Sequence, residues 1–287
     1  MLPSHQVTLV RSSDVARMAR NVTTIKIHRR TTLRLLAATA LLALAGCASV
    51  SGPPAEIALP YVKLFSENEP GEALPNGWRL WTLSRFKKST EYKLVDTGGR
   101  TAVSAKADAS ASGLVHALDL DPQQYPLLNW QWKIDDLIKT ADNTTKQFED
   151  SPVRVVVSFA GDLESLALDD RMFFDNVRLL TRQQLPYATL MYIWENRAPR
   201  NTVLPNLHTS RIKMIVAESG REKVGAWQDI TRNVYEDYKR AFGTEPGRIT
   251  AIAVMTDTDN TGENAHAWYG DIVFRRVAPP RSMFATD

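Results

Sequence analysis

Leu128-Asn129-Trp130-Gln131-Trp132-Lys133-Ile134-Asp135 alternates large apolar side chains with polar ones. Successive side chains of a β-strand point to opposite faces, so this period of two predicts a strand with one face in a core and the other toward water. Residues 153–159, Val-Arg-Val-Val-Val-Ser-Phe, are rich in β-branched side chains and are followed by Gly161, which predicts a second strand.

Further short runs of strand character follow the same pattern and are separated by turn residues. Four lie at 188–195, 212–218, 249–257 and 268–274, and four weaker ones at 78–83, 92–96, 102–107 and 114–118. About ten short strands predict an all-β fold, a two-sheet antiparallel β-sandwich of jelly-roll or galactose-binding-like type.

One or two helices are expected at the periphery of this sandwich. Asn233 and Glu236 form a capping box, and Gly243 suits the left-handed position that ends a helix. A second helix is expected at about 164–182, where Leu166, Phe173, Val177 and Leu180 share one stripe.

The N-terminal segment has the composition of a secretory signal. Four cationic residues (Lys26, Arg29, Arg30, Arg34) precede twelve residues, 35–46, of which ten are Leu or Ala, and Cys47 is the only cysteine. Small residues before a cysteine resemble a bacterial lipobox, so we expect cleavage between Gly46 and Cys47 and acylation of Cys47. The apolar run is too short for a membrane span of about 20 residues.

This interpretation divides the chain into four parts. They are a signal peptide at 1–46 whose true start could be Met18, the lipidated cysteine and a Pro-rich tether at 47–62, a single β-sandwich domain at 63–277 and a tail at 278–287. The expected location is the bacterial cell envelope, with a lipid anchor in the membrane and the domain in the periplasm. Ala48, rather than Asp, after the cysteine favours the outer membrane.

Charge and cysteine content exclude several classes of function. Seven of the 35 Lys and Arg residues and one of the 32 Asp and Glu residues lie in 1–46, so residues 47–287 carry 28 cations, 31 anions and a net charge of −3. This balance argues against a nucleic-acid partner. No glycine-rich phosphate loop is present, which argues against a nucleotide cofactor. Acylation of Cys47 leaves no thiol for a disulfide or a zinc site.

The acidic loop Met255-Thr256-Asp257-Thr258-Asp259-Asn260-Thr261-Gly262-Glu263 has two interpretations. Alternating oxygen ligands around a tight turn suit Ca²⁺, with Asp257 and Asp259 as ligands and Glu263 or Asp271 as a further carboxylate. The same residue types also cap their own backbone in a hairpin turn without any ion. The sequence leaves both open.

The seven tryptophans divide into core and surface candidates. Trp130 and Trp132 alternate in step with apolar neighbours, and Leu190, Tyr192 and Trp194 share one face, which predicts a core position for all of them. Trp227 lies in a loop-like segment, and Trp268 and Tyr269 lie beside the acidic loop. These three are the candidates for stacking on a sugar.

Two carboxylates that close strands, Glu195 and Glu218, are the weak catalytic candidates. A pair of carboxylates across a cleft is the machinery of a glycosidase, provided that their separation fits. Strand-end glutamates more often cap a turn or pair with a cation, so the enzymatic role stays uncertain and a non-enzymatic role is favoured.

Four strings of sequence resemble a bacterial exported lipoprotein family that is catalogued as domain of unknown function 3047. They are Lys213–Gly220, Arg232-Asn233-Val234-Tyr235-Glu236-Asp237-Tyr238, Val254–Gly262 and Ala267-Trp268-Tyr269-Gly270-Asp271-Ile272. The resemblance covers about residues 65–274. It implies no activity and no catalytic residues, because the family has no established function.

Three functions therefore stand side by side. The first is a non-catalytic β-sandwich module that binds a glycan-like ligand. The second is a glycoside hydrolase or lyase that uses strand-end carboxylates, and the third is a structural envelope protein that binds other proteins. A shared fold alone would not decide among them.

Overall fold

The expected strand at residues 128–135 is strand β5 (Leu127–Ile134), and its even-numbered side chains from Leu128 to Ile134 are all fully buried. The structure is a computed structural model that describes residues 61–82, 84 and 86–276, and all of these belong to one compact unit. Cys47, the expected signal peptide, nearly all of the tether and the tail at 278–287 lie outside the described residues.

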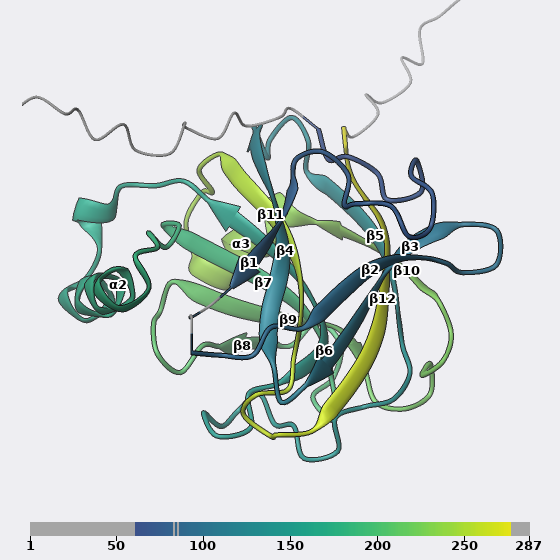
Figure 1. The fold of residues 1–287 in the computed structure, drawn as a ribbon. Helices are drawn as coiled ribbons and strands as arrows, with labels where there is room; N and C mark the ends of the chain where they lie inside the picture. Colours follow the sequence, from purple (N-terminus) through teal and green to yellow (C-terminus); the bar gives the residue numbers. More distant parts are fainter. Residues whose placement is uncertain (1–60, 83, 85, 277–287) are drawn as a thin grey trace, which may run out of the picture. The chain divides into compact units, whose positions relative to one another are not determined.

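Two β-sheets pack face to face, as the sequence predicts (Figure 1). The seven-stranded sheet has the order β1 (Trp78–Thr82), β4 (Ala111–Leu120), β11 (Ile249–Asp257), β6 (Ser151–Phe159), β7 (Ala188–Glu195), β9 (Ile212–Ser219) and β8 (Val203–Pro205). The five-stranded sheet has the order β10 (Gln228–Asn233), β5, β12 (Asn264–Arg275), β3 (Thr101–Asp108) and β2 (Glu91–Asp96).

Strands β3 to β6 alternate between the two sheets, and the last two strands insert between them. Strand β11 lies between β4 and β6, and β12 lies between β3 and β5, which is a jelly-roll connection and confirms the predicted fold class. The expectation of purely antiparallel pairing is wrong at one place, because β7 and β9 are parallel. The short strand β8 turns the chain back at the sheet edge before β9 enters between β7 and β8.

Aromatic side chains from both sheets meet in the core. The ring centroids of Trp130 and Trp132 lie 5.3 Å apart, and across the sandwich Trp130 lies 5.0 Å from Tyr192 and Trp132 lies 6.4 Å from Trp194. All four side chains are at most 1% exposed. The predicted core position of these residues is confirmed.

Helix α3 (Val234–Phe242) has the expected ends. The Asn233 side chain accepts a hydrogen bond from the Glu236 backbone N–H at 3.1 Å, and Gly243 ends the helix with φ of 73°. Val234 and Tyr238 are buried against the core, where the Tyr238 ring lies 4.6 Å from that of Phe159.

The other expected helix is divided into a short 3₁₀ turn, η1 (Leu163–Ser165), and α2 (Leu168–Thr181). Leu166, which was placed on the helix stripe, lies between these two elements. Phe173 and Val177 are half-buried, but Leu180 is 76% exposed, so the predicted stripe is only partly correct. Among the described residues, no helix is long and apolar enough to cross a membrane.

Replacing Trp130 by Ala should lower the free energy of unfolding by about 3–5 kcal/mol, because a fully buried indole leaves a cavity between the sheets. Trp227→Ala is the matched control, since this side chain is 38% exposed and should contribute less than about 1 kcal/mol. Urea denaturation measures both. Equal losses in the two variants would contradict the assignment of Trp130 to the core.

Candidate functional site

The outer face of the seven-stranded sheet, which points away from the core, forms the floor of a groove. On β6, Val153, Val155 and Val157 belong to the core, so Arg154, Val156 and Ser158 point outward. Neighbouring strands add Met191 from β7 and Met255 from β11. The floor is therefore mostly apolar, with Arg154 and Ser158 as its polar side chains on β6.

Two adjoining hollows of about 420 and 400 Å³ make up this groove. They share five lining residues, Trp81, Val156, Ser158, Leu185 and Pro186. The first hollow continues toward β9 and the acidic loop, and the second continues toward β1, where Arg79, Gln183 and Gln184 line it. The groove thus crosses the sheet from β1 to the strands on the far side of β6.

Helix α2 forms one wall of the groove through Phe173, Val177 and Thr181. Its first turn is fixed by Asp170, whose carboxylate accepts hydrogen bonds from the Thr209 hydroxyl at 2.6 Å, the Ser210 N–H at 2.8 Å and the Ser210 hydroxyl at 2.5 Å. The Phe173 ring also stacks on His208, with centroids 6.0 Å apart. The wall is therefore attached to the segment between β8 and β9.

These hydrogen bonds determine the protonation of Asp170. Burial raises the pKa of the carboxyl, but the donors from Ser210 and Thr209 together outweigh it, so the pKa of Asp170 lies below its ordinary value. The carboxylate is accordingly ionised at neutral pH while it holds α2.

Trp81 lies where the two hollows meet, and its ring is half-buried. Its indole N–H donates to the Gln183 side-chain oxygen at 3.0 Å, and the Gln183 amide donates to the Thr82 carbonyl at 2.7 Å. Gly113 faces Trp81 across the β1–β4 pair, and a Cβ at Gly113 would lie 3.1 Å from the indole ring and 2.6 Å from the Val254 carbonyl oxygen. A glycine is therefore required at this position by the Val254 carbonyl, and it also leaves room for the ring to lie against the sheet.

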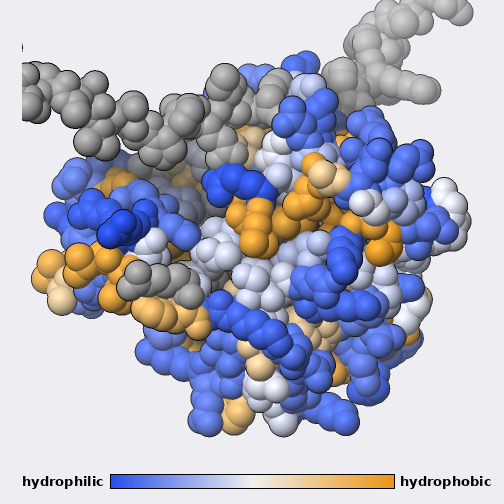
Figure 2. Space-filling view, in the orientation of Figure 1, coloured by the Kyte–Doolittle hydropathy of each residue, from blue (hydrophilic) through white to orange (hydrophobic). Residues whose placement is uncertain are grey.

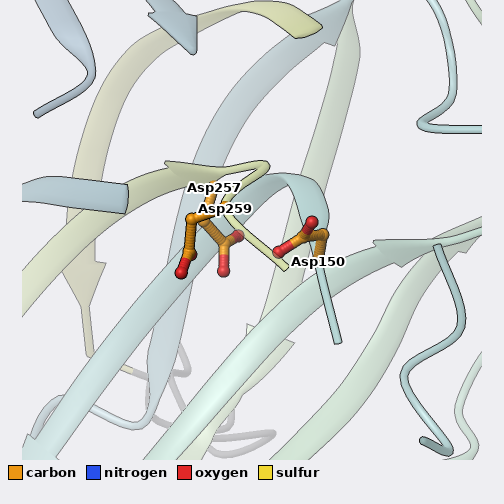
Figure 3. Close-up of side chains that lie close together, drawn as sticks. All are labelled: Asp150, Asp257 and Asp259. Carbon is orange, nitrogen blue, oxygen red and sulfur yellow. The ribbon is translucent and has the colours of Figure 1, made fainter. Parts of the chain in front are cut away.

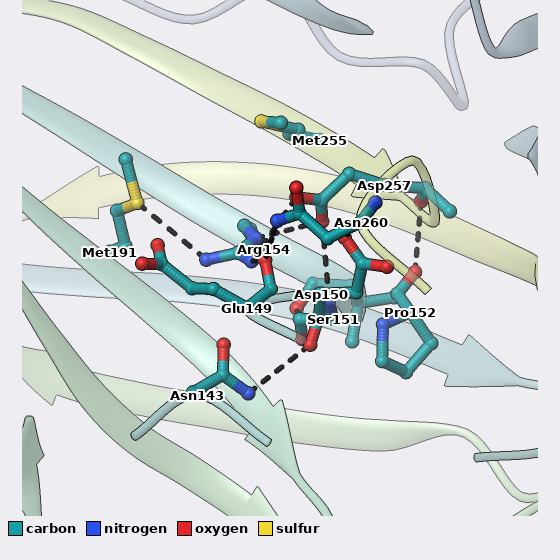
Figure 4. Close-up of polar contacts among 12 residues, drawn as sticks. Asn143, Glu149, Asp150, Ser151, Pro152, Arg154, Met191, Met255, Asp257 and Asn260 are labelled. Carbon is teal, nitrogen blue, oxygen red and sulfur yellow. Dashed lines mark hydrogen bonds and ion pairs between the residues drawn. The ribbon is translucent and has the colours of Figure 1, made fainter. Parts of the chain in front are cut away.

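A buried ion pair between Arg154 and Asp257 lies at the other end of the groove. Arg154 Nε is 2.9 Å from Asp257 Oδ1, its Nη2 is 3.2 Å from Oδ2, and the two side chains are 2% and 7% exposed. Arg154 also donates to the Glu149 carbonyl and contacts Met191 Sδ (Figure 4). Burial raises the pKa of Asp257 to about 6, and the nearby Asp150 adds to the shift while Arg154 opposes it.

Three carboxylates meet beside this ion pair. One oxygen from each of Asp150, Asp257 and Asp259 lies within 4.8 Å of the others, so the group could hold a metal ion (Figure 3). Two of the carboxylates also have a cationic partner, because Arg154 pairs with Asp257 and Lys87 pairs with Asp259. Asp150 accepts a hydrogen bond from the Thr261 backbone N–H at 2.7 Å.

Only two of the four predicted metal ligands lie together. Asp257 and Asp259 lie in the carboxylate group, but Glu263 accepts hydrogen bonds from the N–H groups of Lys139 and Thr140 instead. Asp271 accepts a hydrogen bond from the Ser66 N–H and pairs with Arg100 at 2.8 Å. Asp150 takes the place that Glu263 and Asp271 were expected to fill.

Only two of the three residues of the predicted sugar platform share a surface, because the Lys133 ammonium lies over the rings of both Trp227 and Trp268. Tyr269 is fully buried, and its hydroxyl donates to the Met255 carbonyl, so it is not available to a ligand. Trp268 points outward from the five-stranded sheet, and its half-buried ring contacts His266, 3.9 Å away by centroids, and the Lys133 ammonium, 4.2 Å away. Trp227 is 38% exposed and lines a hollow of about 300 Å³ on that sheet.

The two catalytic candidates are each used by the local structure. Glu195 accepts hydrogen bonds from the N–H groups of Arg197 and Ala198, which caps the turn after β7. Glu218 pairs with Lys223 at 2.8 Å and accepts a hydrogen bond from the Ser219 N–H. Neither glutamate lines the groove over the seven-stranded sheet or the hollow beside Trp227.

A family model described as "Protein of unknown function (DUF3047)" matches residues 76–273. No curated protein matches the sequence.

Solved structures with a similar arrangement include TmCBM61 in complex with β-1,4-galactotriose, at 13% identity and a TM-score of 0.32, covering 75% of this chain and 100% of that chain. The family 30 carbohydrate-binding module of the cellulosomal cellulase Cel9D-Cel44B of Clostridium thermocellum has 11% identity and a TM-score of 0.36. The match covers 77% of this chain and 100% of that module. A Stig cyclase from Fischerella sp. TAU has 12% identity and a TM-score of 0.34, and the match covers 76% of this chain and 99% of the cyclase chain. Likeness at this level assigns no activity.

Replacing Asp170 by Asn should lower the free energy of unfolding at pH 7 by about 1–3 kcal/mol, because buried donors lose their charged acceptor. A carboxyl with a lowered pKa stabilises the fold above its unfolded pKa of about 3.9, and this contribution disappears as the pH falls through the folded pKa. The difference between the two proteins should therefore be largest at neutral pH and shrink below about pH 4.

Denaturant unfolding between pH 3 and pH 7 measures this difference. Asp175→Asn is the matched control, because Asp175 forms only an exposed pair with Arg178 and should contribute less than about 1 kcal/mol. A loss in Asp170→Asn that is the same at both ends of the pH range would show that the carboxylate charge does not hold α2.

Proposed function

The chain belongs to the DUF3047 family, and we propose that its domain is a non-catalytic binding module that holds a glycan-like ligand in the groove over the seven-stranded sheet. The observation that supports this proposal is the fixed position of Trp81 at the junction of the two hollows, next to hydrogen-bonding side chains. The proposal is based on the structure of the groove and not on membership of the family.

A sugar ring has an apolar face of C–H groups and a rim of hydroxyls, so its site needs an aromatic face beside polar side chains. Binding sites commonly combine an apolar lining with a few convergent polar groups. Trp81 and Phe173 supply the apolar surface, and Gln184, Asn260 and Ser158 supply donors and acceptors. Because Trp81 is already held by Gln183, little side-chain entropy is lost when a ligand stacks on it.

The carboxylates of the groove support a binding role more than a catalytic one. Asp257 is bound on both oxygens by Arg154, and Asp259 is paired with Lys87. A general acid or base must lie within hydrogen-bond reach of the ligand, and these carboxylates are directed toward cations of the protein instead.

A hydrolase remains the second candidate because of one specific observation. Asp257 has a pKa raised to about 6 and lines the groove, which is the combination that marks many acid catalysts. In that case Asp257, rather than Glu195 or Glu218, would donate the proton. Release of reducing ends from a bound glycan, lost in Asp257→Asn, would favour the hydrolase over the binding module.

The proposed location is the cell envelope, with acylated Cys47 in the membrane, the outer membrane favoured, and the domain in the periplasm. The lipobox-like sequence before Cys47 supports this proposal. An anchor with several acyl chains would bind a membrane stably, whereas one chain binds only marginally.

Trp81→Ala should weaken glycan binding by about tenfold or more, because a central aromatic contact is lost. A glycan array probed with the detergent-solubilised full chain identifies a ligand, and calorimetry with that ligand gives the affinities. Trp227→Ala is the matched control, since Trp227 lies on the other sheet. Loss of binding in Trp227→Ala with retention in Trp81→Ala would move the site to the five-stranded sheet.

Calcium is the proposed ion for the three carboxylates, in competition with Lys87 for Asp259. Lys87→Met removes a cation from this group, so Ca²⁺ should bind about tenfold more tightly, a gain of about 1.4 kcal/mol. Thermal unfolding in Ca²⁺ and in chelator should then show a larger Tm difference in the variant than in the natural protein. If the Tm difference between Ca²⁺ and chelator were the same in Lys87→Met and in the natural protein, the ion would not be bound by Asp259.

A further inference from the structure

Helix α2 exposes four large apolar side chains to solvent. Leu168, Met172, Leu179 and Leu180 are 71%, 57%, 79% and 76% exposed. Figure 2 shows apolar side chains gathered over this helix, which lies at the margin of the sandwich in Figure 1. Contiguous exposed apolar surface in a protein commonly marks a site of contact with a partner or a membrane.

Three of these residues form one exposed apolar stripe opposite the buried face of the helix. With about 100° per residue, Leu168, Met172 and Leu179 fall within about 40° of one another, while Asp170 and Phe174 lie roughly opposite and are buried. Three arginines, Arg171, Arg178 and Arg182, form a row near the exposed stripe, and Asp175, which pairs with Arg178, lies between the row and the stripe. An apolar stripe bordered by arginines is typical of a helix that lies in a membrane interface.

The distance from the expected anchor allows this contact. The described residues begin at Tyr61, which is 54% exposed, and thirteen residues lie between it and Cys47. Such a segment spans at most about 50 Å, so a lipidated Cys47 would keep the domain near the bilayer. A tether of this length also raises the effective concentration of the helix at the membrane surface.

We propose that the outer stripe of α2, Leu168, Met172 and Leu179, lies in the interface of the membrane that holds the acylated Cys47. The inference rests on the proposed lipid anchor. The fourteen-residue helix is about 21 Å long, and Asp170 attaches its opposite face to the segment between β8 and β9, which leaves the outer stripe free to lie along the membrane surface. The arginine row then faces anionic lipid headgroups.

The experiment uses the full lipidated chain in vesicles of phosphatidylethanolamine and phosphatidylglycerol that contain nitroxide-labelled lipid. Cys47 is the only cysteine, so Leu179→Cys introduces one free thiol for a fluorophore once Cys47 is acylated. The matched control is Lys106→Cys on the exposed face of the five-stranded sheet. Both positions are exposed, and denaturant unfolding should confirm that neither variant loses stability.

We expect the nitroxide lipid to quench the Leu179→Cys label at least about threefold more strongly than the Lys106→Cys label, because the stripe would be buried about 5–10 Å in the interface. Equal quenching at both positions, with the protein on the vesicles, would overturn the inference and leave the anchor intact. If the Leu179→Cys label instead becomes shielded as the protein density on the vesicles rises, whether or not nitroxide lipid is present, the stripe contacts a second copy of the chain. This outcome would also overturn the inference.

Mass spectrometry separates a failure of the anchor from a failure of the inference. A second fluorophore on Cys47 would show that this cysteine is not acylated, which overturns the lipid anchor and the membrane contact of α2 together. Acylation of Cys47 together with quenching of the Leu179→Cys label would support the lipid anchor and the membrane contact of α2.

Discussion

The ion pair between Arg154 and Asp257 is the interaction on which the groove depends. It joins the neighbouring central strands β6 and β11 on the face that points away from the core. Removing two charges from water is costly, and here the two-point contact and the Glu149 carbonyl offset that cost. Loss of either partner would leave an uncompensated charge, at about 3–5 kcal/mol, so both residues fix the acidic end of the groove.

The fold could be predicted from the sequence because its signals are local. Alternation along β5 identifies Trp130 and Trp132 as core residues before any contact is known, and Asn233 and Gly243 mark the ends of α3. The parallel β7–β9 pair could not be predicted, because it depends on the three-residue strand β8, which is too short to leave a periodic signal.

The candidate site was only partly predictable, because its residues come from distant segments. Asp257 and Asp259 are neighbours in sequence, whereas Asp150 joins them from the segment before β6. Tyr269 could have been excluded from the surface, since adjacent residues of a strand face opposite ways and Trp268 was placed outward. The Lys133 contact of Trp268 depends on strand register, which puts Lys133 opposite it on β5.

Helix α2 takes part in both proposals through opposite faces. Phe173 lines the groove and stacks on His208, while Leu179 points away from the domain, and Asp170 attaches the same helix to the segment between β8 and β9. The hydrogen bonds of this one buried carboxylate therefore fix the groove wall and the orientation of the outer stripe together, so a change at Asp170 would disturb both surfaces.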